Sequence, residues 1–487
     1  GKPRARGKSA LFIGLSLFLQ AFQQSHPAMN VSQISCQLLH RAIVAAACIL
    51  AASCAAVPKV NDNPAPQSPQ IVGARGPLTQ AQSQALLARI APEPGDAGIL
   101  KRHTAIEEAV AETPLVAGNA TRLLIDGRDT FAAMFAAIRG ARTSVNLEYY
   151  ILEDVESDGV HLSDLLIAKR QQGVVVNILY DSFGSSATPP DFFRRLREAG
   201  IQVVEFNPLN PVTFNFRDHR KILVVDGAHA IVGGINLSTA YQTVAGSGGA
   251  GGKGPAHWRD TDLEIEGPVV AQLQSLFFRH WEDQKGPPLE RASYFPAISP
   301  KGREVVRIVG STPDEGVPRF YVTLLSAIRN AEKNVWLTTA YFVPTDQEED
   351  DLIAAARRGI DVRLLLPSDS DSKMALAVGR SHYGYLMEAG VKIYEVQNQV
   401  LHSKSATIDG VWTAIGSSNF DPRSVVFNDE VDAIVLGSAT AAAFEHVIQD
   451  DLAHATPIDR ESWRRRPLGQ RLLELFEVTS FLWRNWL

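Results

Sequence analysis

The chain has 487 residues, of which 45% are hydrophobic and 21% charged, and its formal net charge at pH 7 is −6. This length exceeds one ordinary domain, and the composition excludes a wholly disordered chain. Residues 1–54 contain five basic residues and no acidic one, so the rest of the chain holds 42 basic and 53 acidic residues, a net −11. Such an acidic body is a poor polyanion binder, and we expect no nucleic-acid partner.

The leading segment, residues 1–56, is predicted to serve export or membrane anchoring. Its apolar runs ALFIGLSLFLQAF and AIVAAACILAASCAA follow basic residues, as in secretory signals, and both are shorter than a membrane-spanning helix. The second run contains ILAASC, which resembles a lipoprotein box with Cys54 as the candidate for lipidation, although its leucine stands one position too far away. A plain uncleaved anchor is the alternative. All three cysteines lie here, so no disulfide framework is predicted for the body.

After the proline-rich linker VPKVNDNPAPQSPQ, the chain alternates strands and helices from about Thr143. TSVNLEYYIL, VVVNILYDS and IQVVEF have the character of strands, while SDLLIAKRQQG and DFFRRLREAG have the pattern of helices that end at glycine. This alternation predicts an α/β fold, with a mixed β-sheet flanked by helices.

The same order recurs from Asn334, and LREAGIQVVE (196–205) aligns with LMEAGVKIYE (386–395) without a gap. An internal duplication into two lobes related by a pseudo-twofold axis is therefore predicted. The expected organisation is an anchor (1–56), a linker and N-terminal extension (57–115), a first lobe (116–290), a second lobe (291–458) and a C-terminal amphipathic helix (459–487).

Two stretches, DHRKILVVDG (218–227) and LHSKSATIDG (401–410), carry the same polar residues at an offset of 183 positions. The offset also carries GGIN (233–236) onto GSSN (416–419). This regularity argues against a chance arrangement of solvent-facing residues. The candidate catalytic residues are His219, Lys221 and Asp226 in the first stretch and His402, Lys404 and Asp409 in the second, with Asn236 and Asn419 as candidates for substrate binding.

These residue types suit a phosphodiester if the two lobes bring them together. Residues two apart on a strand share a face, so each histidine projects with its lysine. Lysines supply charge to the non-bridging oxygens, and asparagine amides add neutral donors. One imidazole can attack phosphorus to form a phosphohistidine, while the other protonates the leaving alkoxide and then deprotonates the acceptor. This scheme needs no cofactor and no metal, and the sequence lacks HExxH and CxxC motifs.

Each imidazole would need an orienting partner on its second nitrogen. Aligning the glycines that end WRDTDLEIEG and VFNDEVDAIVLG sets Asp260 against Glu430, and we expect these carboxylates to orient the rings. Ordinary strand-edge charges are the alternative. Asp226 and Asp409 belong to the motif, but they follow buried strands, and we expect them to pin the turns.

The duplicated HxKxxxxD, followed each time by G-[GS]-x-N, resembles the phospholipase D superfamily from about residue 120 to the C-terminus. Within it, HRKILVVDG, WRDTDLEIEGPVV, GSSNFDPRSVVFNDE and WRRRPLGQRLLELFE resemble bacterial cardiolipin synthases. The resemblance implies phosphatidyl transfer between phosphatidylglycerol molecules, with His219 as nucleophile and His402 as acid and base, although near-symmetry also allows the reverse. It implies anionic phospholipid substrates, a membrane surface as partner, and a place in the bacterial cell envelope.

Several alternatives remain open at this point. A hydrolase that releases phosphatidic acid would use the same residues. A nuclease of the same superfamily is disfavoured by the acidic body and the fused halves, and an inactive scaffold by the two intact motifs. Because one chain holds both motifs, the chemistry does not require an oligomer.

Two further segments have no counterpart in the motifs. VAGSGGAGGKGPA (244–256) adds 13 residues to the first half and is predicted to be a flexible loop, either a lid or a tolerated insertion. The terminal RRRPLGQRLLELFEVTSFLWRNWL is predicted to be a helix, which lies either in the lipid headgroup layer or on the domain core.

Overall fold

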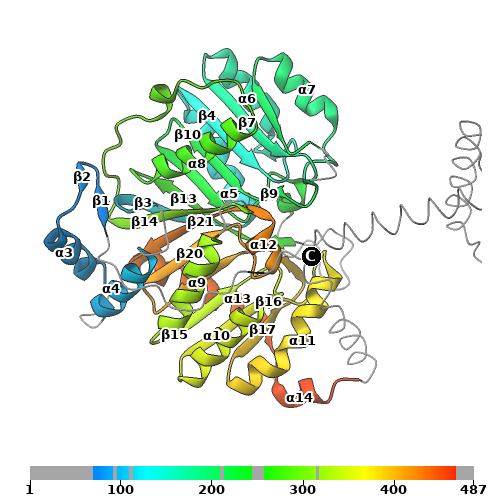
Figure 1. The fold of residues 1–487 in the computed structure, drawn as a ribbon. Helices are drawn as coiled ribbons and strands as arrows, with labels where there is room; N and C mark the ends of the chain where they lie inside the picture. Colours follow the sequence, from blue (N-terminus) through cyan, green and yellow to red (C-terminus); the bar gives the residue numbers. More distant parts are fainter. Residues whose placement is uncertain are drawn as a thin grey trace, which may run out of the picture. The chain divides into compact units, whose positions relative to one another are not determined.

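Two mixed β-sheets with helices on both faces form the framework of the protein, as the computed structural model shows (Figure 1). The structure describes Val57 and residues 70–91, 96–108, 113–208, 213–243, 257–313 and 317–467. The described residues from Val57 onward belong to one compact unit. The α/β architecture with a mixed sheet that the sequence predicts is therefore confirmed.

The first lobe has a sheet in the order β8-β7-β4-β10-β11-β13-β3, in which β4, β7 and β8 are parallel and the other neighbours antiparallel. Helices α5, α6 and α7 lie on one face, and α8 packs on β10 and β11. The strands are β3 (Leu115–Ile125), β4 (Ser144–Tyr149), β7 (Val175–Asp181), β8 (Gln202–Phe206), β10 (Lys221–Val225), β11 (His229–Gly233) and β13 (Thr261–Glu266). The helices are α5 (Asp126–Gly140), α6 (Leu162–Gln171), α7 (Pro190–Glu198) and α8 (Val270–Asp283).

The second lobe has the order β22-β17-β16-β15-β19-β20-β21-β14, with β15, β16 and β17 parallel. Helices α9, α10 and α11 pack side by side, and α13 packs on β20 and β21. The strands are β14 (Glu304–Ser311), β15 (Asn334–Thr338), β16 (Asp361–Pro367), β17 (Lys392–Val396), β19 (Ser405–Ile408), β20 (Trp412–Gly416), β21 (Asn428–Leu436) and β22 (Ala455–Pro457). The helices are α9 (Arg319–Asn330), α10 (Asp346–Arg357), α11 (Lys373–Ala389) and α13 (Ser438–Ala453).

Seven strands follow the same order in the two sheets, from β3 and β14 at one edge to β8 and β17, and the second sheet adds β22 beyond β17. The predicted duplication is thus visible in the topology. The two edge strands β3 and β14 pair with each other in antiparallel fashion and join the sheets. A hydrophobic cluster formed by β10, β11, β13 and α8 of one lobe and β14, β20 and β21 of the other lies at this junction. The lobes therefore share a core, which fixes their relative position.

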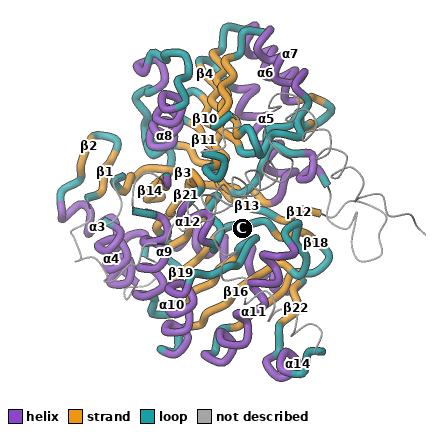
Figure 2. Tube along the Cα trace, turned by 45° about the vertical axis from the view of Figure 1, so that its right-hand side comes forward, coloured by secondary structure: helices purple, strands orange, loops and turns teal. Residues whose placement is uncertain are grey.

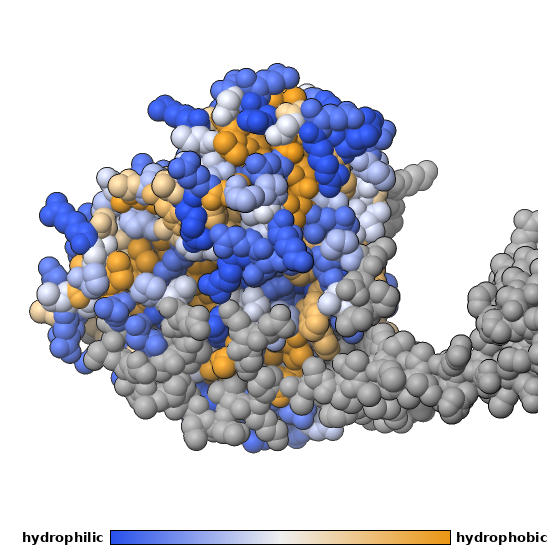
Figure 3. Space-filling view, turned by 45° about the horizontal axis from the view of Figure 1, so that its top comes forward, coloured by the Kyte–Doolittle hydropathy of each residue, from blue (hydrophilic) through white to orange (hydrophobic). Residues whose placement is uncertain are grey.

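The sequence explains why these segments take these forms. The central strands are aliphatic on both sides because helices cover both faces of each sheet; every residue of β10 and of β21 is buried. Helix α10 begins with a capping box in which the side chains of Thr345 and Glu348 satisfy each other's backbone N–H groups. On the face drawn in Figure 3, hydrophilic side chains cover much of the described surface, as expected for helices that bury only one side.

The predicted N-terminal extension is folded where it is described. It contains β1 (Ile71–Gly73), β2 (Gly76–Pro77), α3 (Gln80–Ile90) and α4 (Asp96–Glu107). Strand β1 pairs with β3, and Leu87 and Leu100 join the core of the second lobe. The remaining short elements are β5 (Glu156–Ser157), β6 (Val160–His161), β9 (Arg217–Asp218), η1 (Thr239–Gln242), β12 (His257–Arg259), η2 (Arg291–Tyr294), β18 (Gln399–Leu401), α12 (Pro422–Val426) and α14 (Arg460–Arg464).

Three predicted segments lie mostly outside the described residues: the anchor with Cys54, the glycine-rich segment 244–256, and the C-terminal helix, of which the described part contains α14. Among the helices that are described, none has the length and apolar character needed to cross a membrane.

Candidate active site

Each motif runs into one strand of a β-hairpin that turns at an Asp-Gly pair. Asp226 and Asp409 have φ angles of 52° and 58°, and the glycines that follow have 63° and 65°. Positive φ at both central residues defines a type I′ turn, for which Asp-Gly is a preferred sequence. The turn sets the register of β10 against β11 and of β19 against β20, and so places the histidine and lysine at the opposite end of each hairpin.

The two motif aspartates contact backbone rather than the space between the lobes. Asp226 accepts hydrogen bonds of 2.8–3.1 Å from the backbone N–H groups of residues 142–144. Asp409 accepts equivalent bonds from residues 332–334, and its Oδ2 lies 3.1 Å from Nε2 of His103. Each aspartate thus ties its turn to the start of a neighbouring strand. The arrangement fits the expected pinning of the turns and offers these residues no contact with a substrate.

Two short parallel pairings cross from one lobe to the other and build the site. Strand β9, just before His219, pairs with the start of β21, just before Glu430. Strand β18, just before His402, pairs with β12, just before Asp260 (Figure 2). Each histidine therefore leaves its strand beside the carboxylate of the other lobe, and the two crossings repeat the pseudo-twofold symmetry.

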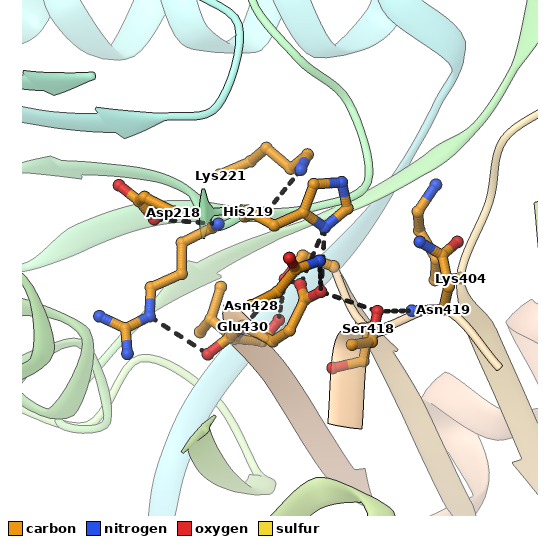
Figure 4. Close-up of polar contacts among 12 residues, drawn as sticks. Asp218, His219, Lys221, Lys404, Ser418, Asn419, Asn428 and Glu430 are labelled. Carbon is orange, nitrogen blue, oxygen red and sulfur yellow. Dashed lines mark hydrogen bonds and ion pairs between the residues drawn. The ribbon is translucent and has the colours of Figure 1, made fainter. Parts of the chain in front are cut away.

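The carboxylates predicted to orient the imidazoles are hydrogen-bonded to them across the lobes. Nδ1 of His219 lies 2.9 Å from Oε2 and 3.1 Å from Oε1 of Glu430 (Figure 4). Nδ1 of His402 lies 2.8 Å from Oδ2 of Asp260. Both carboxylates are fully buried. With Nδ1 engaged in each ring, Nε2 is the atom left for a substrate.

Each lysine hydrogen-bonds to the backbone of its histidine and does not line the cavity. Nζ of Lys221 donates to the backbone oxygen of His219 at 2.5 Å, and Lys404 donates to that of His402. Nζ of Lys404 also lies 2.8 Å from Nδ1 of His402. Both lysines are buried, so their positive charges act on the site through protein rather than through water.

A cavity of about 440 Å³ lies between the lobes. The predicted histidines and asparagines line it, whereas the lysines and the motif aspartates do not. Asn236 lines it with its Oδ1 accepting from the backbone N–H of Ile151 at 3.2 Å. Its other lining residues include Tyr150, Phe183, Phe214, Arg217, Trp258, Tyr341, Asp371 and Arg423.

Sequence reasoning missed several of these wall residues. Tyr150 follows β4 and Tyr341 follows β15, and their rings lie 5.5 Å and 6.0 Å from the ammonium nitrogens of Lys221 and Lys404. The duplication contained part of the signal, because the corresponding segments NLEYYI (146–151) and WLTTAY (336–341) both carry tyrosine near their end, although Tyr341 aligns with Ile151 and not with Tyr150. Arg217 in β9 and Arg423 in α12 carried no such signal, since a lone arginine in a sequence predicts nothing about a site.

Burial dominates the electrostatics of this site. It lowers the pKa of His219 to about 4, against the attraction of Glu430, so the imidazole is neutral at pH 7. Burial also lowers the pKa of His402, and the charge of Lys404 adds to this effect. The pKa of Lys221 falls to about 7 and that of Lys404 to about 8, again because burial disfavours the charged form. An anionic phosphodiester bound here would favour the charged lysines.

One group of residues near the site has the composition of a metal site. Glu148, Asp218 and His280 are buried with their ligand atoms close together. Arg220 already lies 3.3 Å from Glu148, and Nδ1 of His280 lies 2.7 Å from the same carboxylate. Despite burial, the surrounding carboxylates, with Asp429 the strongest, raise the pKa of His280 to about 10. The positive charges of Arg220 and His280 thus already balance these carboxylates. The group therefore fits an internal ion-pair network better than a binding site for a divalent ion.

Comparison with known proteins agrees with the geometry. The profile of a family described as "Cardiolipin synthase, PLD-like domain" matches residues 134–247 and 324–452, one segment in each lobe. Cardiolipin synthase A of Pseudomonas fluorescens (strain SBW25) is 38% identical over 374 residues, which cover 74% of this chain and 75% of that protein. The cardiolipin synthase of Alkalihalophilus pseudofirmus is 34% identical over 371 residues, or 75% of this chain and 72% of that protein.

Among solved structures, phosphatidylserine synthase of Haemophilus influenzae Rd KW20 has the same fold, with a TM-score of 0.61 and 13% identity over 79% of this chain and 98% of that one. Sequence identity and domain match together place the chain in a family. It belongs to the cardiolipin synthase family of the phospholipase D superfamily.

Proposed function

We propose that the protein is a phosphatidyltransferase that converts two phosphatidylglycerol molecules into cardiolipin and glycerol. The observation that carries the proposal is the pair of histidines that face one cavity, each with Nδ1 held by a buried carboxylate of the opposite lobe. Membership of a family whose relatives are named cardiolipin synthases gives the substrate class.

In the first half-reaction, Nε2 of His219 attacks the phosphorus of one phosphatidylglycerol. The P–N bond forms as the P–O bond to the glycerol headgroup breaks, and the imidazolium form of His402 gives its Nε2 proton to the departing oxygen and becomes neutral. Neutral His219 has the lone pair that this attack requires, because burial holds its pKa at about 4. The products are free glycerol and a phosphatidyl-histidine.

In the second half-reaction, a headgroup hydroxyl of another phosphatidylglycerol attacks the same phosphorus. Its proton moves to Nε2 of His402, the new P–O bond forms, and the P–N bond to His219 breaks. Both histidines return to their starting states with cardiolipin released. Water at the acceptor position would give phosphatidic acid instead, so exclusion of water decides between transferase and hydrolase.

The charge on the phosphoryl oxygens is balanced in this scheme by protein groups. Lys221 and Lys404 stand behind the histidines, and Asn236 and Asn419 line the cavity as neutral hydrogen-bonding groups. We therefore propose that the reaction needs no metal and no cofactor. Because both lobes come from one chain, an oligomer is not required either.

A membrane surface is the proposed partner, because the acyl chains of the substrate stay in a bilayer while the headgroup reacts. Phe183 and Phe214 line the cavity and are 46% and 45% exposed, and Met374, next to the lining residue Ala375, is 39% exposed. These apolar side chains suit contact with lipid rather than with water. They support a membrane-associated enzyme of the bacterial cell envelope that does not use nucleic acid as substrate.

The proposal is tested with purified protein and vesicles of phosphatidylglycerol and phosphatidylethanolamine, with products read by lipid mass spectrometry. We expect cardiolipin and glycerol from the wild type, and neither from His219→Ala or His402→Ala. Phosphatidic acid without cardiolipin would reassign the protein as a hydrolase. Cleavage of a nucleic acid without lipid turnover would overturn the substrate class.

A further inference from the structure

The two halves of the site depart from symmetry at the hydroxyl groups around the orienting carboxylates. The offset of 183 residues that relates the motifs also relates Gly234 to Ser417 and Tyr241 to Ser424. In the second lobe both positions are serines, whereas in the first lobe they are a glycine and a tyrosine. Ser417 and Ser424 lie against Glu430, and Gly234 and Tyr241 lie against Asp260.

In the second lobe, two serine hydroxyls and one asparagine amide donate hydrogen bonds to Glu430, the carboxylate that orients His219. Ser417 donates to Oε2 of Glu430 at 2.5 Å, and Ser424 donates to Oε1 at 2.8 Å. The amide of Asn428 adds a third bond at 3.0 Å. These three groups hydrogen-bond to the carboxylate and not to the imidazole. Among the described residues, the partner of Nδ1 of His219 is Glu430 alone.

In the first lobe, the equivalent of Ser417 cannot carry a side chain. A Cβ at Gly234 would lie 2.2 Å from Oδ1 of Asp260, so the carboxylate fills the space that a serine would need. The hydroxyl comes instead from Tyr241 on η1. Its Oη lies 3.3 Å from Oδ2 of Asp260 and, unlike Ser424, also reaches the imidazole, 2.8 Å from Nδ1 of His402.

Packing holds Tyr241 firmly in this place. The side chain is 1% exposed, and its ring contacts Trp258 and His402 edge to face at centroid distances of 5.2 Å and 6.0 Å. The backbone of Gly127 passes so close that a Cβ there would lie 2.1 Å from the carbonyl oxygen of Tyr241. Burial, and then the charge of Asp260, raise the pKa of Tyr241 well above its ordinary value, so the phenol keeps its proton.

Nδ1 therefore has different surroundings in the two rings. In His219 it faces a carboxylate, which accepts only, so one tautomer with a proton on Nδ1 and a bare Nε2 is fixed. In His402 it faces the acceptor Asp260, the donor Lys404 and the hydroxyl of Tyr241, each at 2.8 Å. The phenol donates its proton to Asp260, and its oxygen can accept from the N–H of Nδ1, so Tyr241 can hold the ring in both of its charge states.

We propose that Tyr241 is a positioning residue that acts on His402 alone and makes this ring the acid and base of the transfer. The inference deepens the proposed function and rests on it. A nucleophile needs one fixed protonation state, which Glu430 provides for His219. The acid loses the proton on its Nε2 to glycerol and regains one from the acceptor, so the ring must stay in place while its charge changes, and Asp260 and Tyr241 together hold Nδ1 in both states.

A substrate with an activated leaving group separates the two half-reactions. In short-chain phosphatidyl-p-nitrophenol, the nitrophenolate departs without a proton donor, so formation of the phosphohistidine bypasses His402, while its transfer to phosphatidylglycerol does not. We expect Tyr241→Phe to release a burst of close to one nitrophenolate per enzyme, followed by a steady rate about tenfold or more below the wild type. Mass spectrometry should then find the phosphatidyl group on His219.

Ser424→Ala is the matched control, because it removes the corresponding hydroxyl from the carboxylate of His219. We expect it to slow the burst itself, with no accumulation of the intermediate. Replacement of Tyr241 by a fluorinated tyrosine keeps the shape and acidifies the phenol, and should shift the pH profile of the steady rate but leave the burst unchanged. A merely structural role for Tyr241 would not produce that shift.

The outcomes separate this inference from the proposal on which it rests. A wild-type steady rate and pH profile in both Tyr241 variants would overturn the inference, as would equal slowing of burst and steady rate. A wild type that neither releases nitrophenolate nor makes cardiolipin would overturn the proposed function and the inference with it.

Discussion

Oε2 of Glu430 lies 2.9 Å from Nδ1 of His219, although the two residues are 211 positions apart and belong to different lobes. The reciprocal contact joins Asp260 to His402 at 2.8 Å across 142 positions. Neither lobe alone holds a histidine with its orienting carboxylate. The shared core at the β3–β14 junction is therefore a condition for activity as well as for stability.

Replacing Glu430 by glutamine should reduce transfer about 100-fold or more, with little change in folding. The amide nitrogen would donate toward Nδ1 and favour the tautomer in which Nε2 of His219 carries the proton and cannot attack phosphorus. Initial rates of cardiolipin formation test this. Glu264→Gln is the control, because Glu264 pairs with His229 at 2.8 Å outside the cavity. Equal losses in the two variants would contradict the role of Glu430.

Asp226→Asn should lower stability by about 1 kcal/mol while transfer by the folded protein stays near the wild-type rate. The side chain bonds the backbone of residues 142–144, and asparagine tolerates the positive φ but keeps only one accepting oxygen. Denaturant unfolding and kcat measure the two effects. Asp158→Asn, with φ of 53° in the β5–β6 turn, should be nearly neutral. A large loss of kcat without loss of stability would make Asp226 catalytic.

The hydrogen bonds of Asp226 to the backbone also predict that the free energy of unfolding falls at acid pH. Burial opposes ionisation of Asp226, but the N–H groups of Ser144 and Thr143 outweigh it and hold its pKa below the ordinary value. A depressed pKa in the folded state stabilises the protein above the unfolded-state pKa, near 4, and this stabilisation is lost as the pH falls through the folded-state value. In unfolding curves from pH 6 to 3, the stability difference between wild type and Asp226→Asn should shrink. A constant difference would argue against this linkage.

Affinity for a soluble phosphodiester should weaken as the pH rises from 7 to above 8. Burial lowers the pKa of Lys221 to about 7 and that of Lys404 to about 8, so the free site loses both positive charges in this interval. Calorimetric titration with glycerophosphoglycerol at several pH values measures the change. Proton uptake on binding should appear in the same interval, because the anion restores the charge. Affinity that is flat between pH 6 and 9 would contradict the lysines' part in binding.

Replacing both Phe183 and Phe214 by serine should weaken binding to phosphatidylglycerol vesicles about tenfold, because two half-exposed rings at the cavity would no longer enter the lipid. Sedimentation with vesicles measures binding directly. Tyr385→Ser is a suitable control, since Tyr385 is 69% exposed on α11 and does not line the cavity. A loss of binding only in the control would place the lipid surface elsewhere.

The predictions from sequence were strongest where the chain repeats itself. The offset of 183 residues that links His219 with His402 predicted two lobes, and the matching strand order confirms them. Asp-Gly predicted the turns, because positive φ at two successive positions is a local property of those residues. The sequence could not predict that Arg217 and Arg423 line the cavity, or that Tyr241 contacts His402. Each of these side chains reaches the site through the packing of segments that are distant in the chain.

The sequence by itself determined the candidate site residues, because the motif recurs at a fixed spacing and local strand geometry is expected to put histidine and lysine on one face. Only the tertiary structure decided how those residues pair. Aligning Asp260 with Glu430 made them equivalent but left open which histidine each one serves. Both parallel crossings, β9 with β21 and β12 with β18, join segments that are distant in the chain. Such pairing depends on the docking of complete lobes around a common core, which no local pattern encodes.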